Sequence, residues 1–140
     1  MNKIVKLKFI GIVESVNELS RIRIFQEFCD GLQNLNDFSH IIIFYWFHLR
    51  DNEQDRRVLK VVPKRHPSAP QVGVFASRSP SRPNPIGFSI VELVKIEDCV
   101  LTVKGLDAFE GSPIIDIKPY LLEEFISNAK APKWAMHKST

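Results

Sequence analysis

The sequence predicts a small all-β domain whose strands close, or nearly close, into a barrel with little helix. Its apolar residues occur in short runs that alternate with polar residues or are continuous, as in strands. Turn-forming residues separate these runs, and a chain of 140 residues is long enough to bury its own core. We therefore expect one barrel domain over residues 1–130, followed by a loosely held tail over 131–140.

The strand pattern recurs along the whole chain. It covers, in order, residues 8–15, 22–28, 40–49, 57–62, 71–75, 86–93, 100–106 and 114–117. The β-branched and aromatic residues of 40–49 predict a central strand buried on both faces. Helix is limited to a turn within 27–35 and a possible start at 119–127, where Pro119 suits a first helical position.

Composition excludes several classes of protein. The formal net charge is only +3, and the apolar share of 44% is that of an ordinary globular domain. No apolar stretch approaches the roughly 18 residues of a membrane helix, and the N-terminus does not resemble a signal peptide. Cys29 and Cys99 lack metal-ligand spacing, so we expect reduced, buried thiols in a cytoplasmic protein and no metal.

Basic residues gather in the middle of the chain. Between residues 56 and 82 there is no Asp or Glu, and the basic side chains are Arg56, Arg57, Lys60, Lys64, Arg65, Arg78 and Arg82. This distribution favours a cationic face, although a solvated run of charges remains an alternative.

The loop over residues 77–87 is both rigid and cationic. Its three prolines fix their own φ angles and push the preceding residues towards extended conformations. Arg78 and Arg82 offer planar guanidinium groups suited to phosphate, carboxylate or an aromatic face, and Asn84 offers a donor and an acceptor. Because a preordered loop loses little entropy on binding, it suits a ligand site; a purely structural connector is the alternative.

A second polar cluster lies within residues 104–120. Asp107 and Asp116 stand among apolar residues at strand edges; Asp107 could simply cap a turn, and Asp116 could pair with Lys118. His48 ends the aromatic strand, where a histidine is more often structural than catalytic. No glycine-rich phosphate loop, nucleophile motif or metal spacing is present, so any chemistry must depend on positioning and electrostatics.

Three blocks of the sequence resemble a known family. They are GVFASRSPSRPNPIGFS (73–89), DFSHIIIFYWFH (37–48) and GLDAFEGSPIIDIKPY (105–120). Over residues 9–120 the chain is similar to the TrmO (YaeB/VirR-like) family of S-adenosylmethionine-dependent tRNA N6-methyltransferases, in its archaeal-type short form. The resemblance implies methyl transfer to N6 of threonylcarbamoyl-adenosine beside the anticodon of threonine tRNA. It also implies a homodimer whose cofactor site lies near the subunit interface.

The resemblance also implies roles for individual residues. The cofactor-binding residues would be His48, Leu49, Arg78, Phe88, Lys104, Gly105, Leu106 and Asp107. Asp107 or Asp116 could act as a base, since the substrate N6–H is part of a urea-like group. The tRNA would meet Arg82, Asn84, Lys64 and Arg65, within a basic segment that begins at Arg56. Residues 14–25 lack the Pro-Arg-Gln-rich segment of bacterial members, so Arg21, Arg23 or the partner subunit would complete the pocket.

Two other functions are compatible with these features. A non-catalytic RNA-binding β-barrel could use the same basic loop, although the sequence shows no regular row of exposed aromatic residues for base stacking. A methyltransferase of this fold could also act on another acceptor.

Overall fold

The computed structural model describes residues 3–136. Its contacts divide the chain into two compact units, one of residues 1–48 and 86–121 and the other of residues 49–85 and 122–140. The single barrel domain over 1–130 stays a prediction. None of the helices between residues 3 and 136 has the length and apolar character needed to span a bilayer.

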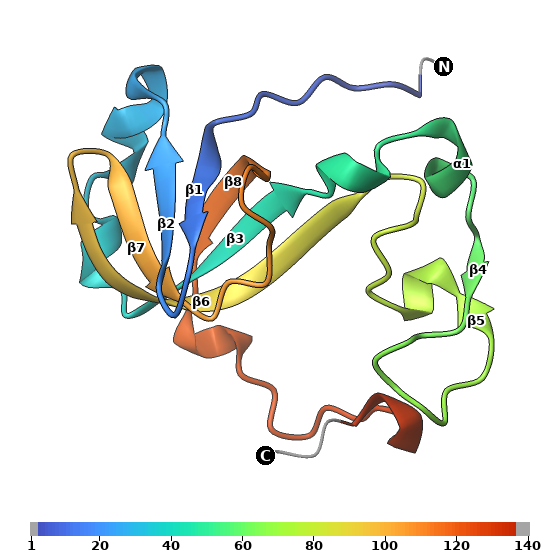
Figure 1. The fold of residues 1–140 in the computed structure, drawn as a ribbon. Helices are drawn as coiled ribbons and strands as arrows, with labels where there is room; N and C mark the ends of the chain where they lie inside the picture. Colours follow the sequence, from blue (N-terminus) through green and yellow to red (C-terminus); the bar gives the residue numbers. More distant parts are fainter. Residues whose placement is uncertain (1–2, 137–140) are drawn as a thin grey trace. The chain divides into compact units, whose positions relative to one another are not determined.

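The first unit is a closed antiparallel barrel, which confirms the predicted fold class (Figure 1). Around the barrel, the strands described in residues 3–136 follow the order β1, β2, β7, β6, β3, β8, and β8 pairs back to β1 through Gly11 opposite Ile114. Their bounds are Gly11–Val16 (β1), Ser20–Ile24 (β2), His40–Trp46 (β3), Ile86–Glu97 (β6), Val100–Lys104 (β7) and Pro113–Pro119 (β8).

Strand β3 is central, as expected, because it pairs with both β6 and β8. Its inward side chains Ile41, Ile43 and Tyr45 are buried in the core. The expected burial on both faces is wrong for Ile42 and Phe44, which are only half-buried. The physical reason is that alternate residues of a barrel strand point outward, so only one face of the strand must line the core.

The ring of Tyr45 closes over Gly87 at the start of β6. A Cβ at position 87 would lie 2.6 Å from Tyr45 and 2.7 Å from Phe47, so the strand accepts no side chain there. This explains why a glycine follows the proline-rich loop.

Two 3₁₀ segments connect β2 to β3, namely η1 (Gln26–Leu32) and η2 (Leu35–Asp37). They confirm the turn expected in this region. Phe28, Leu32 and Leu35 project from them and pack against the barrel core.

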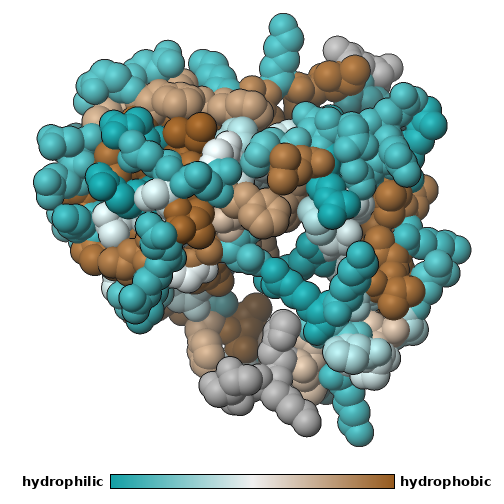
Figure 2. Space-filling model, viewed as in Figure 1, coloured by the Kyte–Doolittle hydropathy of each residue, from teal (hydrophilic) through white to brown (hydrophobic). Residues whose placement is uncertain are grey.

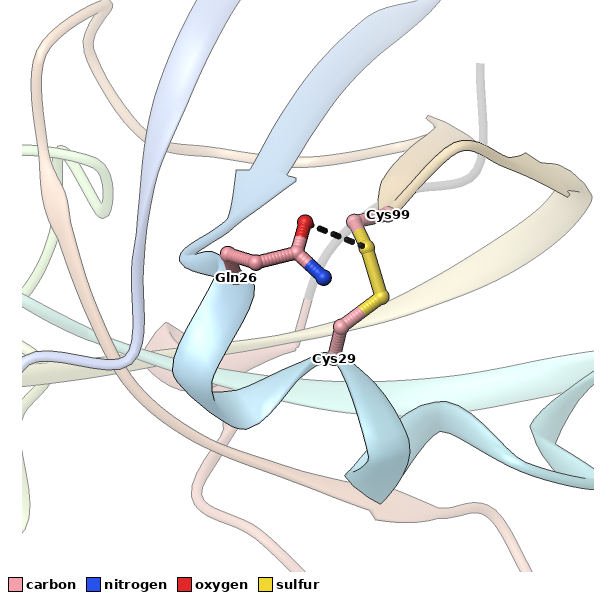
Figure 3. Close-up of a disulfide and its surroundings, with 3 residues drawn as sticks. All are labelled: Gln26, Cys29 and Cys99. Atoms are coloured by element: carbon pink, nitrogen blue, oxygen red, sulfur yellow. Dashed lines mark hydrogen bonds between the residues drawn. A yellow bond between two sulfur atoms is a disulfide. The ribbon is translucent and has the colours of Figure 1, made fainter.

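Cys29 and Cys99 form a disulfide, so the prediction of reduced thiols is wrong (Figure 3). Cys99 lies in the turn between β6 and β7, and its carbonyl oxygen accepts a hydrogen bond of 2.9 Å from Ile24 N–H at the end of β2. Since η1 begins directly after β2, the barrel brings together two cysteines that are 70 residues apart in sequence. Gln26 Oε1 lies 4.0 Å from Cys99 Sγ beside the bridge.

The second unit has little regular structure. Its elements are α1 (Glu53–Arg56), β4 (Lys60–Val61), β5 (Val72–Gly73), η4 (Val74–Ala76), η5 (Leu122–Glu124) and η6 (Lys133–Ala135), and η3 (His48–Arg50) leads into it. The expected strands 57–62 and 71–75 shrink to the two-residue ladder of β4 and β5. The expected helix start at Pro119 is wrong: Pro119 ends β8, and only the short η5 follows.

The expected tail begins with an ordered contact. The ring of Trp134 meets His66 edge-on with centroids 5.7 Å apart, within the second unit. Residues 137–140 of the tail lie outside the described part. Figure 2 shows hydrophilic residues over much of the face presented, with apolar residues in separate patches; exposed aromatic side chains include Phe75, Phe109 and Phe125.

Candidate functional site

The proline-rich loop is held by its own serines and one arginine. Ser79 N–H donates to Ser77 Oγ at 3.3 Å, and Ser81 N–H donates to Ser79 Oγ at 3.2 Å. Arg82 Nη1 donates to the carbonyl oxygens of Ser77 and Ser79, both at 3.1 Å. The alternation of serines therefore has a structural purpose, since the hydroxyls of Ser77 and Ser79 each accept from the backbone N–H two residues further on.

The carboxylate of Asp55, in α1, contacts the loop at Ser81. Ser81 Oγ donates to Asp55 Oδ1 at 2.7 Å, and Asn52 Nδ2 donates to Asp55 Oδ2 at 2.7 Å. Arg50 Nη1 lies 3.3 Å from Asp55 Oδ1. The hydrogen bonds from Ser81 and Asn52, with the nearby Arg50 guanidinium, lower the pKa of Asp55 below its ordinary value of 3.8.

Arg56 reaches the other end of the loop. Its Nε donates to the carbonyl oxygen of Pro83 at 2.8 Å, and its Nη2 donates to Asn84 Oδ1 at 3.4 Å. Its Nη1 forms an ion pair of 3.0 Å with Asp51. Arg56 is thus already engaged by three oxygen atoms.

These contacts narrow the cationic face expected from residues 56–82. Asp51 pairs with Arg56 and Glu53 pairs with Arg57, although both acids precede the basic window in sequence. The absence of acidic residues within a window of sequence does not make its surface free of carboxylates. Lys60, Lys64 and Arg65 remain as exposed basic residues between Arg57 and the loop.

The two arginines of the loop differ in their exposure. Arg78 is exposed, whereas Arg82 is half-buried and directs Nη1 to loop carbonyls. Residue type alone does not distinguish their exposure, because each arginine directly follows a serine. Arg78 is therefore better placed to meet a ligand, and Arg82 to brace the loop.

Phe88 and the segment 104–107 both belong to the first unit. Phe88 stacks on Phe44 across the β3–β6 ladder with ring centroids 6.3 Å apart. After Lys104, the chain turns at Gly105, whose φ of 97° is the left-handed conformation that glycine adopts without strain. The chain then continues along β6, where Asp107 N–H meets Ser89 Oγ.

The backbone N–H and C=O groups of Asp107 are both hydrogen-bonded. Its N–H donates to Ser89 Oγ at 3.2 Å, and its carbonyl oxygen accepts a hydrogen bond from the Tyr45 hydroxyl. Ser89 follows Phe88 directly in β6. Asp107, which is exposed, is thus held by its backbone beside Ser89.

Asp116 is exposed on β8. Its Oδ1 accepts a hydrogen bond of 2.8 Å from Ile117 N–H, and it lines a cavity of about 390 Å³ together with Glu27 and Phe28 of η1. Phe44 of β3 lies between two cross-strand partners, Asp116 on β8 and Phe88 on β6. Within residues 3–136, no three His, Cys, Asp or Glu residues are grouped in a way that could hold a metal ion.

The candidate residues thus fall into two sets. His48, Phe88, Asp116 and the segment 104–107 belong to the first unit, and Leu49, Lys64, Arg65, Arg78, Arg82 and Asn84 belong to the second. Sequence reasoning missed Asp55, Ser81 and the role of Arg56. Two signals could have indicated them: the regular spacing of Ser77, Ser79 and Ser81, and the helix start Asn52–Asp55, where Asn52 caps Asp55 N–H at 2.8 Å.

Comparison with known proteins adds a family match. Residues 13–124 match the family model of the tRNA-methyltransferase O N-terminal domain (TrmO). A "Probable S-adenosyl-L-methionine-binding protein" of Archaeoglobus fulgidus is 42% identical over 142 residues, covering 91% of this chain and 37% of the relative. One of the same description from Methanothermobacter thermautotrophicus is 48% identical over 104 residues, covering 74% of this chain and 71% of the relative.

More distant relatives include an enzyme and solved structures. A tRNA (adenine(37)-N6)-methyltransferase of Homo sapiens is 40% identical over 103 residues, covering 74% of this chain and 23% of that protein. A crystal structure of TrmO from Pseudomonas aeruginosa superposes with a TM-score of 0.74 at 23% identity, covering 95% of this chain and 62% of the other. The chain therefore spans less than two thirds of several of the proteins it matches.

Proposed function

We propose that this chain, which belongs to the tRNA-methyltransferase O (TrmO) family, binds S-adenosylmethionine and methylates tRNA. The proposed target is N6 of threonylcarbamoyl-adenosine beside the anticodon of threonine tRNA, in the cytoplasm. The observation that carries the proposal is the family match over residues 13–124, which includes the proline-rich loop and the segment 104–107.

The residues of the candidate site fit the chemistry of S-adenosylmethionine. The exposed guanidinium of Arg78 suits a carboxylate, and the ring of Phe88 suits the face of an adenine. His48, Leu49 and the segment 104–107 would supply the remaining contacts. The cofactor supplies a methyl group on a sulfonium, and its transfer requires in-line alignment and exclusion of water rather than a protein nucleophile.

A carboxylate would accept the proton that leaves N6. We propose Asp107 for this role before Asp116, because the backbone of Asp107 is fixed by hydrogen bonds with Ser89 and Tyr45. Asp116 lies instead at the cavity that it lines with Glu27 and Phe28 of η1.

The tRNA would meet the basic residues of the second unit. We propose that Lys64 and Arg65 contact phosphates, and that Arg82 and Asn84 form the substrate side of the loop. Lys64 and Arg65 are both exposed.

We further propose that the chain acts as a homodimer. The outward face of β6 beside Phe88 carries Ile86 and Ile90, which are 40% and 49% exposed. Contact of this apolar face with a second copy would place the cofactor residues near the subunit interface. Light scattering at micromolar concentration would show twice the mass of the chain, and a monomer would contradict this part of the proposal.

Nucleoside mass spectrometry tests the function as a whole. The protein is incubated with S-adenosylmethionine and with threonine tRNA that carries the threonylcarbamoyl group, and the digested nucleosides are weighed. The expected product is the threonylcarbamoyl nucleoside heavier by one methyl group. Methylation of another acceptor would contradict the proposed substrate, whereas binding of tRNA without any binding of S-adenosylmethionine would indicate an RNA-binding barrel.

A further inference from the structure

The proline-rich loop lacks three of its backbone N–H donors. Pro80, Pro83 and Pro85 lack N–H groups, so the loop cannot attach itself to its surroundings through a regular backbone ladder. Prolines restrict the torsion angles within the loop but do not fix its place. Other groups must therefore hold it.

Those groups come from the short segment around α1. Arg50 donates to Ser81 Oγ at 3.2 Å, and Asp55 accepts from the same hydroxyl at 2.7 Å. Ser81 is 9% exposed, so its hydroxyl has exchanged water for these two partners. At the other end of the loop, Arg56 donates to Pro83 O at 2.8 Å and faces Asn84 Oδ1.

We propose that Asp55 and Arg56 are positioning residues for the methyl-transfer site, which hold the loop 77–85 so that Arg78 is presented to the cofactor. This inference rests on the proposed function of the loop. Neither residue touches the cofactor; each acts through the loop residues that it binds. The same network assigns Ser81 as the buried contact point and Arg56 as a brace rather than an RNA contact.

The shape of the Arg56 guanidinium allows a test that distinguishes a brace of the loop from an RNA contact. A guanidinium can reach Pro83 O, Asn84 Oδ1 and Asp51 at once from three nitrogen atoms in a plane, whereas an ammonium cannot reproduce this fork. An arginine that only neutralises a phosphate is replaced well by lysine, because the charge is kept. Arg56→Lys therefore removes the brace and keeps the charge.

The matched control is Arg57→Lys. Arg57 is the next residue, and its partner Glu53 is one turn earlier on the surface, where the two side chains are 75% and 77% exposed. A contact of this kind contributes little and does not reach the loop. The control thus repeats the chemical change at a position without the proposed role.

Two measurements on the full chain test the proposal. Calorimetric titration with S-adenosylmethionine should show a dissociation constant raised about tenfold or more in Arg56→Lys, since small misplacements of a contact group are costly. Ser81→Ala and Asp55→Asn should weaken binding as well, and the losses of Ser81→Ala and Asp55→Asn should not add in the double variant. Arg57→Lys should bind as the wild type does.

Hydrogen exchange of the loop supplies a readout independent of the cofactor. The N–H groups of Ser79 and Ser81, protected in the wild type by their serine acceptors, should exchange faster in Arg56→Lys and unchanged in Arg57→Lys. Unchanged exchange and cofactor affinity in Arg56→Lys, with weaker tRNA binding in Arg56→Ala, would overturn the proposal in favour of an RNA contact. A wild type that binds no S-adenosylmethionine would instead refute the proposed function, while the exchange data would still decide whether Arg56 holds the loop.

Discussion

Gly87, near the start of β6, follows the proline-rich loop at a position where the packing leaves no room for a side chain. The aromatic rings of Tyr45 and Phe47 occupy the space where a Cβ would stand. Gly87→Ala should therefore lower the free energy of unfolding by about 1–3 kcal/mol, the usual cost of overpacking a core. Urea denaturation followed by circular dichroism measures this change.

Gly31 offers a matched control for that substitution. A Cβ at position 31 would meet nothing within 4 Å, and the residue belongs to η1 of the same unit. Gly31→Ala should leave stability nearly unchanged or slightly raised. Equal losses in the two variants would show that the close approach at Gly87 is not the cause.

The hydrogen bonds of the Asp55 carboxylate predict how stability depends on pH. Ser81, Asn52 and Arg50 all stabilise its charged form, so its pKa lies below 3.8 in the folded chain. A lowered pKa means that the contribution to stability is present above pH 3.8 and is lost as the pH falls through the native pKa. The carboxyl carbon of Asp55, followed by NMR, should titrate below 3.8 in the wild type and closer to 3.8 in Ser81→Ala. A wild-type pKa at or above 3.8 would contradict the role of these donors.

At the scale of elements, the sequence predicted the barrel better than the loop unit. Periodicity located every strand because alternate burial in a barrel leaves a direct pattern in the chain. The errors have physical causes: β6 runs on to Glu97 through a register shift near Lys95, and 57–62 and 71–75 pair over only two residues each. Apolar alternation indicates that a segment can be a strand, but the length of a strand depends on its partner.

The site was predicted in part for a similar reason. The residue types of the loop indicated Arg78 and Arg82 alike as candidates for ligand binding. The contacts of Arg82 with Ser77 and Ser79, which the structure shows, indicate that it braces the loop. The importance of Asp55 depends on a contact with Ser81, 26 residues away, which no local spacing reveals. The disulfide was missed because no local spacing in the chain reveals the pairing of Cys29 with Cys99.

The disulfide between Cys29 and Cys99 leads to a prediction about the stability of the elements that it joins. The bridge ties η1 to the β6–β7 turn across a separation of 70 residues. By limiting the unfolded chain, a loop of this length stabilises the fold by roughly 4 kcal/mol, less any relaxation of the unfolded state. The double variant Cys29→Ala/Cys99→Ala should unfold at lower urea than the oxidised wild type.

Reduction separates this effect from simple packing. The wild type in excess dithiothreitol should approach the stability of the double variant, whereas dithiothreitol should not change the double variant itself. Free-thiol titration of protein isolated without reductant should find no reactive thiols. Two reactive thiols in that protein would contradict the bridge.

At the scale of the whole molecule, the balance of charge limits how tRNA can be held. A net charge of +3 gives little general attraction to RNA, so affinity must come from a few local contacts. The ion pairs of Arg56 and Arg57 remove two of the basic residues that the sequence suggested for this purpose. The exposed Lys64 and Arg65 are the proposed phosphate contacts.

Salt dependence of tRNA binding tests this distribution of charge. Each phosphate contact releases condensed counterions, so the loss of one contact lowers the slope of log affinity against log salt by about 0.7 to 0.9. Lys64→Ala should reduce the slope by roughly that amount, and Lys64→Ala/Arg65→Ala by about twice as much. Arg57→Ala should leave the slope unchanged, because its guanidinium is already paired with Glu53. An equal loss of slope in Arg57→Ala would mean that the ion pairs of α1 open on RNA, and that the cationic face is as wide as the sequence alone implied.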